Sequence, residues 1–121
     1  MGPSQRSFGV DDAGVGDAPG VVVHGEVDIA VVDTFEAAID AAIRESVGAF
    51  IIDLSDLHFI ESTGLHVLLR ARGLLSREDR QLAVVCPHGP VRRALELSGL
   101  SDQFALYGSR DEALAALVPA D

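Results

Sequence analysis

Short apolar runs alternate with amphipathic helical patterns along most of this chain, and this alternation limits the folds that the chain can adopt. The runs are three to six residues long, which suits a buried strand and is too short for a helix. Strands are expected at residues 21–25, 49–54, 82–85 and 104–107. A helix that joins two strands of one sheet forms a right-handed crossover, which leaves the strands parallel. The pattern therefore predicts an α/β fold.

Four helices are expected between and after these strands, because apolar residues recur there at intervals of three and four. Their expected ranges are residues 33–47, 62–76, 90–98 and 109–118. Two capping boxes, Asp33 with Glu36 and Ser109 with Glu112, favour the starts of the first and last helix. We therefore expect a single domain with a mixed, mostly parallel sheet of about four or five strands and about four helices.

The first 20 residues differ in composition from the rest of the chain. They contain five glycines, two prolines and three aspartates. Such a segment buries little apolar surface, so we expect a flexible acidic arm that has room for one short strand at residues 8–10. The ordered domain is expected to span residues 21–118.

The charge of the chain excludes two classes of partner. The chain has nineteen acidic residues and nine basic residues, all of them arginine, and its formal net charge is -10. Such a charge repels nucleic acid and anionic lipid. The longest apolar run, residues 113–118, is far shorter than a membrane span. No secretory signal is visible at the start, so we expect a cytoplasmic protein.

Residues that bind metals or cofactors are sparse. Cys86 has no second cysteine to pair with, and the four histidines stand too far apart for a zinc site. The chain has neither a glycine-rich loop that ends in Lys-Ser or Lys-Thr nor a G-x-G-x-x-G motif. Asp53 and Asp56 flank a turn that we expect them to shape. No metal and no cofactor is predicted.

Two junctions are candidates for a functional site, residues 25–30 and 59–64, because sites in α/β folds gather where strand ends meet helix starts. Ser62 is expected to cap the helix that follows, a role that could explain it fully. A phosphate on an exposed hydroxyl there would gain N–H donors while adding about -1.5 to -2 charges. Asp28 is open to three interpretations: a solvated turn residue, a helix-capping relay, or part of a site shared with the Ser62 loop.

A catalytic role for Ser62 meets two objections. The nucleophile elbow of hydrolases needs a glycine two residues to either side of the serine, and here those positions hold Ile60 and Gly64. His66 follows one turn later, but no downstream aspartate and histidine complete a triad in the expected order. We therefore do not expect an enzyme.

Four segments in this order resemble the STAS domain of bacterial anti-sigma factor antagonists. They are Gly-Glu-Val-Asp at residues 25–28, Ile-Ile-Asp-Leu-Ser-Asp-Leu at 51–57, Phe-Ile-Glu-Ser-Thr-Gly-Leu at 59–65 and Pro-Val-Arg-Arg-Ala-Leu-Glu-Leu-Ser-Gly-Leu at 90–100. The resemblance covers nearly the whole ordered chain. It implies that the unphosphorylated domain binds an anti-sigma factor, so that a sigma factor is released.

The same resemblance assigns roles to individual residues. It implies that Ser62 is phosphorylated by the anti-sigma factor, a serine kinase with a histidine-kinase-like ATPase fold, and that a metal-dependent serine phosphatase removes the phosphate. The implied partner-binding residues are Asp28, Glu61, Ser62, Thr63 and Gly64. We expect no direct contact with nucleic acid or with a membrane. The family has aspartate where this chain has Glu61, and this departure motivates the alternative of an unmodified interaction or scaffold module.

Overall fold

The computed structural model describes residues 7–12 and 18–117 of the chain. In these residues it shows six strands, β1 (Gly9–Asp12), β2 (Gly20–Val27), β3 (Phe50–Asp53), β4 (Leu57–Ile60), β5 (Leu82–Val85) and β6 (Ala105–Tyr107). Four α-helices accompany them, α1 (Val32–Arg44), α2 (Ser62–Arg77), α3 (Pro90–Leu97) and α4 (Arg110–Ala116), with a 3-10 turn at Ser101–Gln103. No helix in the described ranges combines the length and the apolar character needed to cross a membrane.

The strands form one mixed sheet in the order β1-β2-β3-β5-β6. β1 is antiparallel to β2, and the other pairs along this path are parallel. β4 lies off the path and pairs in parallel with the carboxyl-terminal half of β2. The predicted α/β class with its mostly parallel sheet is confirmed.

β4 is the strand that the sequence did not predict. Its end residues, Leu57 and Ile60, are buried, whereas the two residues between them, His58 and Phe59, are exposed. This order is neither a continuous apolar run nor a strict alternation, the two patterns that identify strands. Pairing with β2, which is remote in sequence, is what fixes β4 as a strand.

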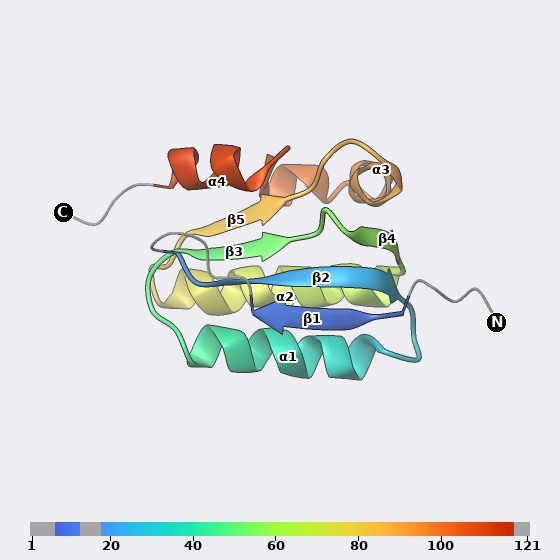
Figure 1. Cartoon of the computed structure of the whole chain (residues 1–121), viewed down its shortest axis with the longest axis horizontal. Helices are drawn as coiled ribbons and strands as arrows, with labels where there is room; N and C mark the ends of the chain where they lie inside the picture. Colours follow the sequence, from blue (N-terminus) through green and yellow to red (C-terminus); the bar gives the residue numbers. More distant parts are fainter. Residues whose placement is uncertain (1–6, 13–17, 118–121) are drawn as a thin grey trace.

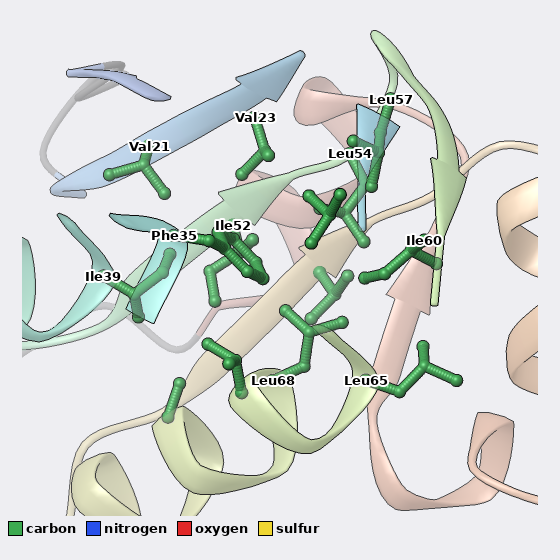
Figure 2. Close-up of a cluster of buried hydrophobic side chains, with 14 of the residues drawn as sticks. Val21, Val23, Phe35, Ile39, Ile52, Leu54, Leu57, Ile60, Leu65 and Leu68 are labelled. Atoms are coloured by element: carbon green, nitrogen blue, oxygen red, sulfur yellow. The ribbon is translucent and has the colours of Figure 1, made fainter. Parts of the chain in front are cut away.

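The helices cover the sheet in two layers. α1 and α2 lie together on one face, α4 lies on the other, and α3 packs beside β4 (Figure 1). The larger core fills the space between the sheet and the α1–α2 layer, where Phe35 and Ile39 of α1 and Leu68 of α2 belong to one buried cluster with residues of β2 and β3 (Figure 2). A smaller cluster that includes Ile51 of β3 and Ala113 of α4 closes the opposite face. β3 is therefore buried on both sides, as its continuous apolar run predicts.

The start of α1 differs from its prediction. The helix begins at Val32 after Val31, and no side chain accepts a capping hydrogen bond, so the predicted capping box of Asp33 and Glu36 is wrong. Asp33 is the second residue of the helix, where its negative charge still interacts favourably with the positive end of the helix dipole. The chain reaches this start through a turn in which the Asp28 carbonyl accepts the Val31 N–H at 3.1 Å.

The predicted cap of the last helix is confirmed. Ser109 Oγ accepts the Glu112 N–H at 3.2 Å. The Glu112 carboxylate reaches back to the Gly108 N–H at 3.0 Å, one residue before the position that an ideal capping box would use. α4 ends at Ala116, and Val118, expected to belong to it, lies outside the described residues.

The expected arm contains part of the sheet. β1 confirms the predicted short strand near residues 8–10 and extends it to Asp12. Residues 1–6 and 13–17 of the arm lie outside the described residues. The strand expected at residues 21–25 begins at Gly20 and continues to Val27, because its last residues pair with β4.

The buried thiol of Cys86 makes stability depend on alkaline pH. Burial raises the pKa of this thiol from 9.0 to about 11. Above pH 9 the thiol ionises in the unfolded chain but stays mostly neutral in the folded one. The free energy of unfolding should therefore fall by about 2 kcal/mol by pH 11. The chain contains one tyrosine and no lysine, so few other groups titrate in this window.

Urea denaturation at pH 8, 9, 10 and 11 measures this loss. Cys86→Ala should abolish the alkaline loss of stability, whatever its effect on stability at pH 8. Any contribution of Tyr107 is common to both proteins, because both retain this residue. Equal alkaline losses in the two proteins would contradict the assignment to Cys86.

Candidate functional site

Two strand ends and one helix start meet at a single edge of the sheet. Val27 and Ile60 are register partners at the ends of β2 and β4. The Glu61 N–H donates to the Val27 carbonyl at 2.9 Å and continues this pairing by one residue. The two junctions predicted from the sequence are therefore neighbours in space, with Asp28 following one strand and Glu61 the other. We call this region the Ser62 edge and define it by Asp28, Glu61 and Ser62.

Ser62 is exposed and is the first residue of α2, so the prediction that it caps the helix is wrong. The N-cap is Glu61, whose φ of -83° and ψ of 168° are extended. The Glu61 carbonyl accepts the N–H groups of Gly64 at 2.9 Å and Leu65 at 3.1 Å. Within the described residues, neither the Ser62 hydroxyl nor the N–H groups of Ser62 and Thr63 have a hydrogen-bond partner. A free hydroxyl thus stands beside free donors at the positive end of the helix dipole.

The next two residues of the motif point to internal roles. Thr63 Oγ1 is buried and has no hydrogen-bond partner in the described part of the chain. Gly64 is buried, and a Cβ there would lie 2.7 Å from Ile60 Cγ1 and 2.8 Å from Val27 Cγ1. Its missing side chain lets the first turn of α2 approach β2 and β4 closely. Gly64 therefore helps to set the position of Ser62.

Asp28 forms a turn directly beside the Ser62 loop. Its Oδ1 accepts the Ala30 N–H at 3.0 Å, and the residue is half-buried. This bond makes the turn between β2 and α1 an Asx turn. Among the three roles left open by the sequence, the structure shows the turn, and its place next to Glu61 is compatible with a shared site. The side chain does not cap α1.

The charge at the Ser62 edge is negative. In the part of the chain that the structure describes, neither Asp28 nor Glu61 forms an ion pair, and the Glu61 side chain makes no hydrogen bond. His66 is exposed one turn further along α2 and makes no hydrogen bond to Ser62. The edge thus offers two carboxylates and a hydroxyl, without the hydrogen-bonded base that activates a serine nucleophile.

Asp53 shapes a turn, as predicted, whereas the Asp56 carboxylate makes no hydrogen bond or ion pair within the described residues. Asp53 Oδ1 accepts the Ser55 N–H at 2.8 Å, and the Asp56 carbonyl accepts the Gly25 N–H at 3.2 Å. Asp53 is buried and also accepts a hydrogen bond from Arg110 Nε of α4, a partner that the sequence did not indicate. No group of three or more His, Cys, Asp or Glu in the described residues is arranged to hold a metal ion.

Two apolar side chains near the Ser62 edge were missed by sequence reasoning. Ile29 follows Asp28 and is 71% exposed, and Phe59 lies in β4 and is 45% exposed. Apolar residues at a strand end normally suggest a core position, so the sequence holds no signal that would have set these two apart. Their exposure is visible only once the register of β2 and β4 is known.

Comparison with known proteins identifies the family. The STAS domain model matches residues 13–113. An anti-sigma F factor antagonist of Paenibacillus polymyxa is 32% identical over 98 residues, 80% of this chain and 84% of the relative. The anti-sigma-F factor antagonist RsfB of Mycobacterium tuberculosis is 30% identical over 106 residues, 85% of this chain and 86% of RsfB. The crystal structure of an anti-sigma factor antagonist from Mycobacterium paratuberculosis is similar with a TM-score of 0.85 and 32% identity, covering 94% of this chain and 97% of that chain. The chain therefore belongs to the STAS domain family, as its four sequence motifs indicate.

Proposed function

We propose that this protein is an anti-sigma factor antagonist that binds an anti-sigma factor through the Ser62 edge and thereby releases a sigma factor. The observation that carries this proposal is the exposed Ser62 hydroxyl at the start of α2, with the unpaired N–H groups of Ser62 and Thr63 beside it. The names of the relatives that align over most of the chain support the same role. The protein acts by binding in the cytoplasm and is not itself an enzyme.

Phosphorylation of Ser62 switches this binding off. The anti-sigma factor, a serine kinase, transfers the γ-phosphoryl group of ATP to Ser62 Oγ; the bond to ADP breaks, and the serine proton passes to a base of the kinase. The free N–H groups and the helix dipole accommodate the new phosphate locally. At the interface, however, a phosphate of about -1.5 to -2 charges replaces a neutral hydroxyl next to Asp28 and Glu61. The complex separates without refolding of the domain, and a serine phosphatase restores the binding form.

Phosphate transfer and binding can be tested together. The anti-sigma factors with an ATPase fold that the same genome encodes are purified and incubated singly with the protein and ATP. We expect one phosphate, located on Ser62 by mass spectrometry. Ser62→Ala should bind without being modified, and Ser62→Glu should bind at least about tenfold more weakly because its charge is poorly paired in the complex.

Ser76→Ala is the matched control, because Ser76 is an exposed serine on the same helix. This variant should be phosphorylated and should bind like the wild type. If a kinase that is active on another substrate leaves Ser62 unmodified, or if Ser62→Glu binds as tightly as the wild type, the switch is wrong.

A second candidate is a scaffold module that binds its partner without being modified. Glu61 favours it, because it is the N-cap of α2 and makes no capping hydrogen bond, whereas a shorter aspartate is well suited to that bond. The presentation of Ser62 to a kinase therefore differs from that in the family motif. The scaffold predicts that no kinase modifies Ser62 and that Ser62→Ala leaves both affinity and cellular output unchanged.

A further inference from the structure

Large apolar side chains are rarely exposed in this protein, and two of the exposed ones lie at the Ser62 edge. The structure shows four in its described residues: Ile29 at 71%, Val47 at 84%, Phe59 at 45% and Leu97 at 76% exposure. Val47 lies in the loop between α1 and β3, and Leu97 is the last residue of α3. Ile29 and Phe59 instead belong to the two segments that meet beside Ser62.

The β2–β4 pairing brings together the two segments that carry Ile29 and Phe59. Val27 and Ile60 are register partners, and the Glu61 N–H binds the Val27 carbonyl. Ile29 follows Val27 by two residues, and Phe59 directly precedes Ile60. With about 3.8 Å between consecutive Cα atoms, both backbone positions lie within about 8 Å of this pair. Ser62 lies two residues beyond Ile60, so Ile29, Phe59 and Ser62 all belong to segments that meet at this edge of the sheet.

Neither side chain is needed for the core to the extent that its size suggests. β4 buries its end residues, Leu57 and Ile60, and leaves Phe59 45% exposed. Phe59 makes no ring contact with another aromatic side chain in the described residues. Ile29 lies in a turn where polar residues are the usual choice. Exposed apolar groups that the fold does not require are typical of binding surfaces.

We propose that Ile29 and Phe59 are the apolar anchors of the interface with the anti-sigma factor. This inference rests on the proposed function. Interfaces draw most of their affinity from a few apolar anchors that a polar rim shields from water. Here Asp28 and Glu61 supply a rim of negative charge. The complementary surface is therefore an apolar depression bordered by arginine or lysine side chains.

The anchors and Ser62 have separate tasks in this arrangement. Ile29 and Phe59 supply affinity in the unphosphorylated state, and they fix the partner over the Ser62 hydroxyl. The kinase reaction uses the same contact surface, so loss of an anchor weakens substrate binding without changing the reacting atoms. The expected signature in phosphorylation kinetics is a raised KM with an unchanged kcat.

Four serine substitutions test the proposal. Ile29→Ser and Phe59→Ser remove the anchors. Val47→Ser and Leu97→Ser are the controls, because they remove exposed apolar side chains elsewhere on the protein. Calorimetric titration of each unphosphorylated variant with the anti-sigma factor that binds the wild type measures Kd. Each anchor variant should bind about 10–30-fold more weakly, whereas each control should stay within about twofold of the wild type. Urea denaturation should give similar midpoints for Ile29→Ser and the two controls, because all three positions are highly exposed.

Each outcome decides between the proposals. If the wild type binds and both anchor variants bind equally well, the anchors are wrong while the proposed function stands. If the controls lose as much affinity as the anchor variants, the loss is not specific to Ile29 and Phe59 and the inference is again wrong. If no anti-sigma factor binds the wild type, the proposed function itself fails. If Phe59→Ser disturbs β4, Ile29→Ser still tests the proposal, because Ile29 lies outside every strand and helix.

Discussion

Replacing Arg110 with methionine should lower the free energy of unfolding by about 3 kcal/mol, because the change leaves the carboxylate of Asp53 buried without a charged partner. Asp53 is only 4% exposed, and the Arg110 guanidinium is its ion-pair partner in the described residues. The Ser55 N–H remains as a hydrogen-bond donor but carries no charge. Methionine keeps the length and helix propensity of the side chain, so the start of α4 is otherwise little affected.

Arg70→Met is the matched control. Arg70 pairs with Glu36 at 3.0 Å and Asp40 at 2.9 Å on the surface of α1 and α2, where solvent screens both pairs. Its removal should cost less than about 1 kcal/mol. In the double variant Asp53→Asn with Arg110→Met, most of the loss should be recovered, since the amide oxygen can still accept the Ser55 N–H without a buried charge. Equilibrium urea denaturation followed by circular dichroism gives all three values, and equal losses for Arg110→Met and Arg70→Met would contradict the argument.

The elements that the sequence predicted are those whose pattern is local. Leu82–Val85 is a strand with the predicted bounds, and the helix predicted to begin at Ser62 does so. In both cases a few consecutive residues carry the whole signal: an apolar run for the strand, and leucines at helical spacing for the helix. The α/β class follows from the alternation of such segments and needs no knowledge of distant contacts.

The features that the sequence did not predict depend on partners far away in the chain. β4 is a strand because it pairs with β2. Arg110 reaches Asp53 across 57 positions. Arg80 donates to the Gly48 carbonyl at 2.7 Å and to the Ile43 carbonyl at 2.9 Å, closing the carboxyl end of α1. A charged or polar residue has many candidate partners in a sequence, and only the assembled sheet selects one.

The candidate site shows the same division. Residues 25–30 and 59–64 could be predicted as candidate segments, since sites in α/β folds gather where strand ends meet helix starts. Their meeting could not be predicted, because it depends on the pairing of β4 with β2. The identity of the N-cap could not be predicted either, because the dihedral angles of Glu61 decide whether Glu61 or Ser62 occupies that position. The exposure of Ile29 and Phe59 also escaped prediction, since apolar composition alone favours burial.

Gly64→Ala should destabilise the protein by about 3 kcal/mol, the upper end of the usual cost of overpacking a core. The added Cβ would lie 2.7 Å and 3.0 Å from Cγ1 and Cδ1 of Ile60 and 2.8 Å from Cγ1 of Val27. Both neighbours are β-branched side chains in paired strands, so neither can move aside cheaply. The strain should appear as a lower urea midpoint, and it should also displace the first turn of α2.

Gly73→Ala separates packing from helix propensity. Gly73 lies in the same helix, and a Cβ there would meet no atom within 4 Å, so this variant should gain about 0.5–1 kcal/mol. If Gly64→Ala were equally stable, close approach would not be the reason for glycine at that position. Because Ser62 is two residues before Gly64, displacement of this turn should also weaken binding of the anti-sigma factor under conditions where the variant is fully folded, while Gly73→Ala should bind like the wild type. A contribution of Gly64 to partner binding is therefore expected to act through the position of Ser62, since glycine presents no side chain of its own to the partner.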